Sequence, residues 1–274
     1  MKKQFHFILL LFLGSCSEPE LALDNEYDED NPDYIAPETI IISTDPIIQD
    51  NKIISDELTV VWEGNEENME FRYSLDNRPW SEWSSLPSAT FRYLDDTLHT
   101  ILVKGRYESG TEEDFPDTLE FEVDAIDGTS LRMNKLYTTV SNQNTFRIDV
   151  VAEEAELLAG CGILIEYNSD ALELLGEDEG VDIGEFFERN NGSVLAFDTT
   201  ITSAGTTILF LDIGMYGGSP DYVSGTGTIA SLYFLATLPG EYDIEFDEEN
   251  TSLRKANNQE IEINTLKKGI VNIE

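Results

Sequence analysis

The sequence predicts an all-β protein, in which two β-sandwich domains follow an acidic tether. Three observations predict this class. From residue 40 to the C-terminus, short apolar segments of strand length alternate with turn residues. These segments form two groups, which a short polar stretch at 124–128 separates. After residue 15, no apolar run approaches the roughly 20 residues that a membrane-spanning helix needs.

The chain begins with the features of a secretory signal peptide, residues 1–15. Lys2 and Lys3 precede an apolar stretch, and two small residues follow it directly before Cys16. The segment Leu13-Gly14-Ser15-Cys16 resembles the lipobox of bacterial lipoproteins. That resemblance implies that Cys16 is acylated and becomes the mature N-terminus, so that the acyl anchor is the only contact with a lipid bilayer. The alternative is an ordinary signal peptide that happens to contain a cysteine.

Residues 16–37 form the predicted tether. From Ser17 to Glu38 the chain has nine acidic residues and no basic one, with few apolar residues to bury, so this stretch is expected to be disordered. Acidic residues directly behind an acylated cysteine resemble the export signal of surface lipoproteins in some Gram-negative bacteria. The resemblance implies an outer-membrane lipoprotein exposed on the cell surface.

The charge of the chain excludes one class of partner. Asp and Glu number 55 against 16 Lys and Arg, for a formal net charge of −39. Nucleic-acid binding needs clustered Lys and Arg, which this sequence lacks. The second cysteine, Cys161, has no partner if Cys16 carries lipid, so no disulfide framework is expected. Cys161 lies in an apolar run, which predicts a buried small side chain and not a reactive thiol.

The first sandwich is predicted at residues 38–125, where six strand segments occur at sandwich density. The segments Phe71–Ser84 and Leu98–Lys104 resemble immunoglobulin-like modules of bacterial surface and sensor proteins, a pattern that fibronectin-like modules share. The resemblance implies a spacer. Trp80 and Trp83 are expected to pack in the core of their hairpin, with a ligand platform as the alternative. The six segments are 40–43, 58–62, 69–75, 89–93, 98–107 and 119–123.

The second sandwich is predicted at residues 127–274, where about nine strand segments suit a jelly roll. Its opening segments, Phe146–Val150, Leu158–Gly160 and Ile163–Tyr167, resemble those of cohesin domains, and the closing segments follow in the same order. The resemblance implies a fold related to bacterial carbohydrate-binding sandwiches, a fold that serves two binding modes. The nine segments are 131–139, 145–151, 161–167, 194–198, 206–214, 228–237, 242–246, 260–263 and 269–273.

The sequence predicts no catalytic residue, no metal site and no cofactor. Beyond the signal peptide, His99 is the only histidine, and its place between apolar strand residues favours a structural role. The second domain therefore has no histidine with which to form a Ser-His-Asp triad or a histidine zinc site. The acidic stretches Asp28–Asn31 and Glu177–Glu179 lack the spacing of a calcium loop and are expected to be solvated. These absences favour a binding protein over an enzyme.

The expected partner-binding face lies on the strand at 160–167. If Ile163, Ile165 and Tyr167 point inward, the outward residues are Gly160, Gly162, Leu164 and Glu166. In cohesins the partner is a calcium-loaded dockerin, but glycine at 160 and 162 departs from the polar contact residues usual there. A dockerin-like or another protein partner is therefore expected. Two alternatives stay open: a polysaccharide stacked on Tyr216 and Tyr222, or a purely structural envelope component.

Overall fold

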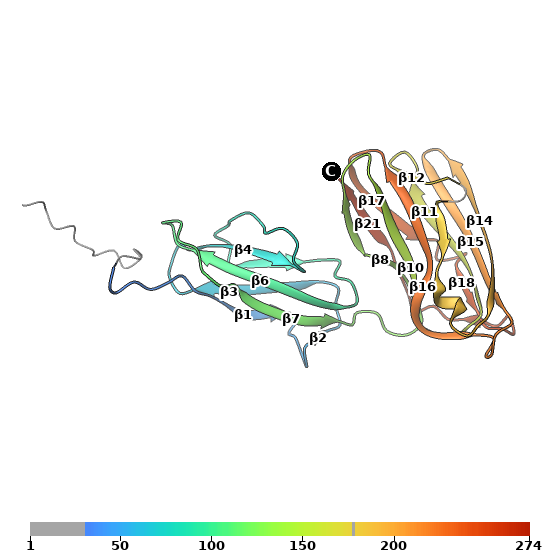
Figure 1. The fold of residues 1–274 in the computed structure, drawn as a ribbon, viewed down its shortest axis with the longest axis horizontal. Helices are drawn as coiled ribbons and strands as arrows, with labels where there is room; N and C mark the ends of the chain where they lie inside the picture. Colours follow the sequence, from blue (N-terminus) through green and yellow to red (C-terminus); the bar gives the residue numbers. More distant parts are fainter. Residues whose placement is uncertain (1–30, 177–178) are drawn as a thin grey trace, which may run out of the picture.

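The computed structural model describes residues 31–176 and 179–274 (Figure 1). The predicted signal peptide, Cys16, most of the predicted tether and the pair Glu177 and Asp178 lie outside the described residues. Strands dominate the described ranges, and the helical content there is one short 3₁₀ segment, η1 (Glu185–Glu188). The predicted all-β class is confirmed. Among the described residues, no helix has the length and apolar character to cross a membrane.

The N-terminal unit is a sandwich of two sheets. Every strand predicted for it is present, and the structure adds one two-residue strand, β2. Alternation places Leu58, Val60 and Trp62 of one sheet against Ile101 and Phe121 of the other, all almost fully buried. The three-stranded sheet has the order β1 (Thr39–Asp45), β3 (Leu58–Gly64), β5 (Ser88–Phe91), and the four-stranded sheet the order β2 (Lys52–Ile53), β7 (Asp117–Val123), β6 (Leu98–Arg106), β4 (Glu70–Leu75).

Trp80 and Trp83 lie outside this core, so the expected hairpin-core packing is wrong. Their rings are stacked with cationic side chains of β4 and β6. The Arg72 guanidinium lies 4.5 Å from the ring centre of Trp83 and 5.2 Å from that of Trp80, and Arg106 lies 4.4 Å from Trp83. The core position is occupied instead by Trp62. These cation–π contacts place both rings against charged side chains of the sheet.

The C-terminal unit is a larger sandwich of two sheets, and both are drawn in Figure 1. One has the order β12 (Leu172–Leu174), β16 (Val223–Ala236), β10 (Thr145–Leu158), β8 (Ser130–Asn134), β20 (Thr265–Lys267), and β13 (Val181–Ile183) also pairs with β16. The other has the order β14 (Ser193–Ser203), β15 (Thr206–Tyr216), β11 (Gly160–Asn168), β17 (Gly240–Phe246), β21 (Gly269–Ile273), β9 (Tyr137–Val140). In the second sheet β18 (Ser252–Arg254) pairs with β11 and with β19 (Glu260–Ile261).

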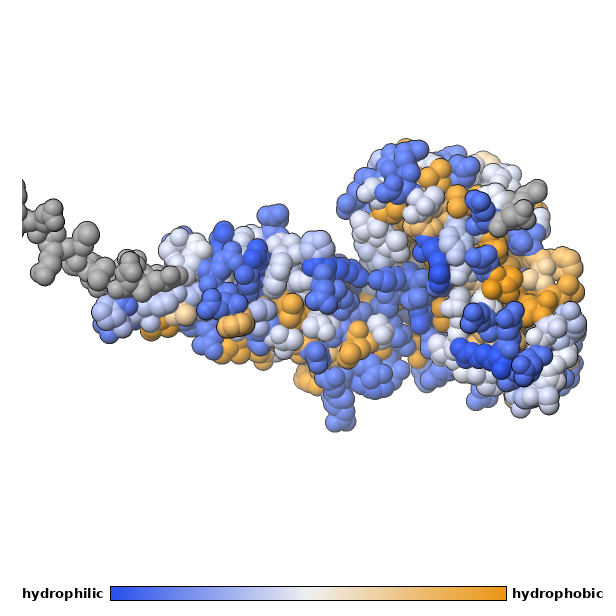
Figure 2. Space-filling view, in the orientation of Figure 1, coloured by the Kyte–Doolittle hydropathy of each residue, from blue (hydrophilic) through white to orange (hydrophobic). Residues whose placement is uncertain are grey.

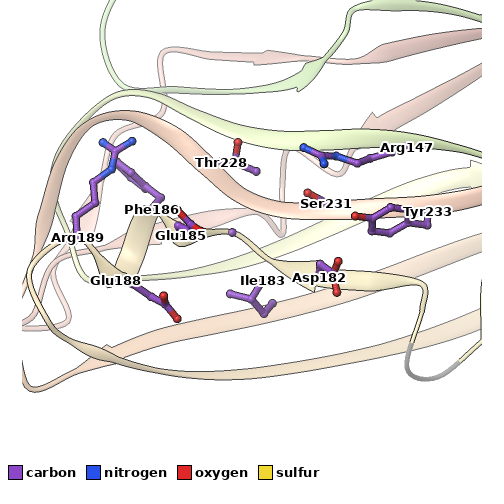
Figure 3. Close-up of a pocket in the computed structure, with 11 residues that line it drawn as sticks. Arg147, Asp182, Ile183, Glu185, Phe186, Glu188, Arg189, Thr228, Ser231 and Tyr233 are labelled. Carbon is purple, nitrogen blue, oxygen red and sulfur yellow. The ribbon is translucent and has the colours of Figure 1, made fainter.

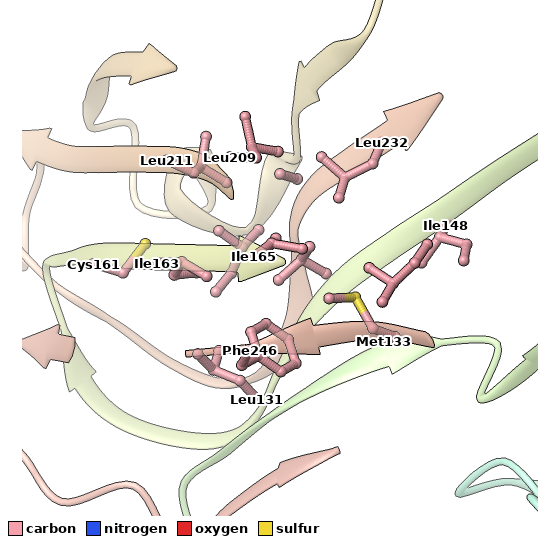
Figure 4. Close-up of a cluster of buried hydrophobic side chains, with 14 of the residues drawn as sticks. Leu131, Met133, Ile148, Cys161, Ile163, Ile165, Leu209, Leu211, Leu232 and Phe246 are labelled. Atoms are coloured by element: carbon pink, nitrogen blue, oxygen red, sulfur yellow. The ribbon is translucent and has the colours of Figure 1, made fainter. Parts of the chain in front are cut away.

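The core of this unit fills the space between the two sheets (Figure 4). Met133 and Ile148 contribute from one sheet, and Ile163 and Leu209 from the other, each with 0% exposure. Cys161 lies in the same core and is 5% exposed, and burial raises the pKa of its thiol to about 12. The expected burial of this cysteine is confirmed, and a raised thiol pKa predicts low reactivity.

One predicted strand of this unit is two strands in the structure. The segment 131–139 forms two strands, β8 and β9, which belong to opposite sheets. The chain crosses from one sheet to the other at residues 135 and 136, where Leu136 is buried. The short strands β12, β13, β18 and β20 were not expected from the sequence, because segments of three residues carry no readable period.

The two units touch at a small junction, at the end of the N-terminal unit that faces the C-terminal unit in Figure 1. Lys267 Nζ lies 2.9 Å from Asp56 Oδ2, and the Leu136 N–H donates to Asp95 Oδ1 at 2.8 Å. The rings of Tyr93 and Tyr137 are stacked at 5.8 Å and 9°. These contacts join loops of the first sandwich to β20, to the turn between β8 and β9, and to β9 itself.

His99 lies behind this junction and is 4% exposed. Its Nδ1 is 2.8 Å from Asp76 Oδ2, and its Nε2 is 2.8 Å from the carbonyl oxygen of Asp95. Both ring nitrogens thus have hydrogen-bond partners inside the N-terminal unit. The expectation of a structural histidine is confirmed.

Candidate partner-binding face

The outer face of β11 has the predicted register. Ile163 and Ile165 are fully buried and Tyr167 is 4% exposed, whereas Gly160, Gly162 and Leu164 are partly exposed and Glu166 is exposed. The alternation follows from the two-residue period of a strand that covers a core on one side only. All four residues of the expected face therefore lie on the outer surface of the sheet.

Pairing across the sheet extends this face into rows. Gly160 lies beside Gly214 of β15 and Arg254 of β18, and Gly214 in turn lies beside Leu195 of β14. The next row contains Phe197, Asp212, Gly162 and Ser252 in strand order. A third contains Thr199, Phe210 and Leu164, and the fourth contains Ile201, Ile208 and Glu166. Directly opposed residues of neighbouring strands share one face, so these side chains form one continuous surface.

This surface exposes large apolar side chains. Phe197 is 65% exposed, and Leu195, Ile201 and Tyr216 are each more than half exposed. Figure 2 shows hydrophobic residues gathered at the side of the C-terminal unit that β14 and β15 form in Figure 1. Among the described residues β14 ends the sheet, and no strand from them pairs with its outer backbone edge. Exposed apolar surface next to a free strand edge is typical of a site where another chain docks.

The glycines of the face form the floor of a hollow of about 720 Å³. A Cβ atom at Gly162 would lie 3.0 Å from Asp212 Oδ1, and one at Gly160 would lie 3.0 Å from the carbonyl oxygen of Ile213. Larger side chains at either position would fill the hollow. Leu195 and Phe197 line one side of it, and Arg254 and Lys255 line the other.

Arg254 and Lys255 give one end of the face a positive charge. Neither makes an ion pair within the described ranges, and Arg254 donates a long hydrogen bond of 3.4 Å to the carbonyl oxygen of Asn258. The opposite end is acidic, because Glu166 lies beside Glu245 of β17. A chain of net charge −39 thus presents an apolar surface with two cations at one end.

The expected face left out Leu195, Phe197, Arg254 and Lys255. The sequence does carry a signal for β14, because Leu195, Phe197 and Ile201 recur at even spacing beside polar residues. Nothing in the sequence indicates that this apolar row faces solvent. β18 has three residues and no period, so its place beside Gly160 could not be predicted.

Of the two tyrosines of the glycan alternative, only one lines the hollow. Tyr216 ends β15, is 61% exposed and lines the hollow. Tyr222 does not line the hollow, and its carbonyl oxygen accepts a hydrogen bond from Asn190 Nδ2 at 2.5 Å. A stacking platform that uses both rings therefore has no support in the geometry of this hollow.

A second hollow, of about 780 Å³, lies on the outer face of the other sheet (Figure 3). Its lining carries charges of both signs, from the acidic residues Asp182, Glu185 and Glu188 and the basic residues Arg147 and Arg189. The Arg189 guanidinium lies 4.6 Å from the ring centre of Phe186. The hollow thus combines three carboxylates with two guanidinium groups, and its lining contains no histidine.

No metal site is apparent in the part of the chain that the structure describes. Within residues 31–176 and 179–274, no three His, Cys, Asp or Glu side chains converge in a way that could hold an ion. Of the two acidic stretches considered above, Asp28–Asp30 and Glu177–Asp178 lie outside the described residues. The face on β14, β15, β11 and β18 offers apolar contact and charge.

No protein-family model matches the chain, and no curated protein matches it. Solved structures similar to about half of the chain include cohesins. One is a non-cellulosomal cohesin from the archaeon Archaeoglobus fulgidus, with 12% identity, coverage of 54% of this chain and 92% of that chain, and a TM-score of 0.39. A type I cohesin–dockerin complex from Clostridium thermocellum has 12% identity, coverage of 54% and 100%, and a TM-score of 0.42. A type II cohesin–X-dockerin complex from Acetivibrio cellulolyticus has 17% identity, coverage of 53% and 99%, and a TM-score of 0.46.

Proposed function

We propose that this chain is a surface-anchored, non-catalytic binding lipoprotein that holds a protein partner on the outer face of β14, β15, β11 and β18. The observation that carries the proposal is the exposed apolar row of Leu195, Phe197 and Ile201 beside a hollow with a glycine floor. Burying a side chain such as Phe or Leu contributes about 1.5–3 kcal/mol, so several exposed ones on one face favour docking of a second surface.

The proposed partner surface combines an apolar ridge with acidic groups. The ridge would fill the hollow over Gly160 and Gly162, beside the side chain of Asp212, whose Oδ1 lies 3.0 Å from the position that a Cβ atom at Gly162 would take. Carboxylates beside the ridge would pair with Arg254 and Lys255, which have no acidic partner within the described ranges. The sequence resemblance to cohesins makes a dockerin-type module one such partner. The missing side chains at positions 160 and 162 favour a partner that brings its own bulk to this place.

The anchoring part of the proposal rests on the sequence. The lipobox-like segment that ends at Cys16 supports acylation, and the acidic stretch behind it supports export to the outer surface of an outer membrane. Wild-type protein should partition into detergent, and Cys16→Ala should remain in the aqueous phase. Protease added to intact cells should remove the protein, and protection until the outer membrane is opened would place it inside.

A capture experiment with matched variants tests the binding part. Wild type, Phe197→Glu and Lys255→Glu are immobilised, and envelope proteins of the source cells are passed over each. A specific partner should be retained by wild type and lost from both variants, because one places a charge in the apolar contact and the other reverses the positive end. Lys52→Gln is the control, because Lys52 is an exposed cation of the N-terminal unit with its own acidic partners. Equal capture by all four proteins refutes the proposed face.

Polysaccharide binding at the same hollow is the second candidate function, since Tyr216 is exposed at its rim. A glycan array distinguishes the two candidates. Retention of a neutral glycan that Tyr216→Ala abolishes, without capture of any protein, favours the glycan. Absence of both activities favours a structural envelope component.

A further inference from the structure

The junction of the two units contains a pocket that the proposed binding face does not use. It has a volume of about 550 Å³, within the range of about 300–1,000 Å³ that is usual for small-molecule sites. Arg78 lines it from the N-terminal unit. The other seven lining residues belong to the C-terminal unit: Asn134 ends β8, Lys135 lies in the turn that follows, Tyr137, Thr138 and Thr139 belong to β9, and Arg147 and Asp149 belong to β10. The two units thus both contribute to the pocket.

The charge of this pocket is unusual for the chain. The sequence has 16 Lys and Arg residues, of which Lys2 and Lys3 lie outside the described residues. Nine of the other 14 make ion pairs. With 55 acidic residues in the chain, a cation that lacks a partner is the exception. Arg78 and Lys135 are two of these exceptions within the described ranges, and both line the same pocket.

Arg147 adds little net charge to the pocket, because it is paired with Asp149. Its Nε and one terminal nitrogen donate to Asp149 Oδ1 and Oδ2, each at 2.7 Å. Ser231 Oγ also donates to Asp149, at 2.6 Å. Burial favours a raised pKa for Asp149, but these hydrogen bonds outweigh it and hold the pKa below its ordinary value. The paired Arg147 and Asp149 cancel, so the net positive charge of the pocket comes from Arg78 and Lys135.

Local structure fixes the backbone at both unpaired cationic residues. Asp76 and Asn77 both have positive φ, of 51° and 58°, as a tight hairpin turn requires. Arg78 follows directly, with its N–H bonded to the carbonyl oxygen of Leu75 and its carbonyl oxygen bonded by Ser74 Oγ. Across the junction, the N–H of Leu136, the residue after Lys135, donates to Asp95 Oδ1. The backbones of the two cationic residues are therefore fixed, which lowers the entropy cost of holding an anion between them.

From this arrangement we propose that the junction pocket binds a carboxylated sugar, a hexuronate unit of an acidic glycan. A guanidinium and an ammonium together suit a single carboxylate. Hydroxyl and amide groups of Thr138, Thr139 and Asn134 both donate and accept, as the hydroxyls of a sugar ring require. The sugar unit seated between the two cations brings one charge and several neutral hydroxyls, so the net charge of −39 opposes this unit less than it opposes a phosphate dianion or the closely spaced carboxylates of an acidic peptide.

Calorimetric titration of the purified full chain in detergent with trigalacturonate tests this site. The matched probe is the methyl-esterified trisaccharide, which keeps the shape and loses the charge. Trigalacturonate should bind at least about ten-fold more tightly than the ester, because a carboxylate between two cations makes charge-assisted hydrogen bonds. Arg78→Gln and Lys135→Gln should each weaken trigalacturonate binding by about ten-fold, and both changes together should abolish it.

The control and the competing ligands make the test decisive. Lys52→Gln removes one exposed cation that does not line the pocket and should bind as wild type does. Thr139→Glu keeps the fold, because residue 139 is exposed, and should repel the ligand. Three results overturn the proposal: no binding of trigalacturonate, equal binding of acid and ester, or unchanged binding by both glutamine variants. Tighter binding of inorganic phosphate or of a glutamate-rich peptide than of trigalacturonate would overturn the sugar assignment.

Discussion

Leu164→Arg tests the orientation of β11 and the role of its outer face in one variant. Leu164 is half-buried on the outer face, and its neighbours Ile163 and Ile165 are fully buried. Its N–H donates to Thr251 Oγ1 and its carbonyl oxygen accepts from the Asp247 N–H, and both bonds involve only the backbone of residue 164. The substitution therefore leaves the hydrogen bonds of the strand intact.

The expected loss of stability is small. Full burial of a leucine side chain contributes about 1.5–3 kcal/mol, so a half-buried one contributes roughly half of that. The aliphatic stem of arginine covers part of the same surface, which leaves a net cost of at most about 1 kcal/mol. Ile165→Ala, on the inner face of the same strand, should cost about 2–5 kcal/mol because it opens a cavity in the core. Urea unfolding of the two variants measures this difference directly.

The binding result completes the test. A partner seated on the face should bind Leu164→Arg at least about ten-fold more weakly, because an unpaired charge would lie in the apolar contact. If Leu164→Arg destabilises the chain as much as Ile165→Ala does, the outward orientation of residue 164 is refuted. If it folds and binds the partner fully, the partner docks on another surface.

Three further predictions concern stability and reactivity. Residues 127–274 should unfold cooperatively without the N-terminal unit, because the junction is small and mostly polar; a fragment that stays insoluble, or melts without a transition in calorimetry, would show that the first unit is needed. The lowered pKa of Asp149 gives stability that is present above its unfolded-state value, about 3.9, and is lost as pH falls through the folded-state value. Asp149→Asn should therefore be less stable than wild type near neutral pH, and this difference in urea midpoint should shrink below about pH 4. Cys161, with its pKa raised to about 12 by burial, should resist alkylation at about pH 8 and react once urea unfolds the C-terminal unit; rapid labelling of the folded chain would contradict its burial.

The periodicity of the sequence was enough to predict most strands. β11 illustrates this, because Ile163, Ile165 and Tyr167 alternate with smaller or polar residues and cover one core. The same argument failed for residues 131–139. Their pattern reads as one apolar strand, and the crossing between the two sheets depends on which sheet each half pairs with. Such pairing is a long-range property that no local window contains.

The candidate face, too, could be predicted from the sequence only in part. The outward residues of β11 followed from alternation alone. Arg254 and Lys255 reach the face because β18, more than 80 residues further along the chain, pairs with residues 160–162. The junction pocket was also beyond prediction, since Arg78 and Lys135 come from different units and meet through a few polar contacts. The location of Trp80 and Trp83 outside the core could not be predicted for a related reason: the arginines that contact their rings are brought together by the pairing of β4 with β6.

The strong negative charge of the chain and the exposed apolar edge of β14 have opposite effects on self-association. β14 has 11 residues, ends its sheet and exposes Leu195, Phe197 and Ile201. Such an edge invites pairing with a second copy, and this strand has no lysine or proline to prevent it. A net charge of −39 repels identical copies at the distance where two edges would meet, even though salt screens charges beyond about 8 Å. A partner of lower net negative charge, whose few carboxylates pair with Arg254 and Lys255, is repelled less strongly than a second copy of this chain. The charge thus disfavours self-association and leaves the face open to a different molecule, which is the condition that a binding protein with an exposed apolar face must meet.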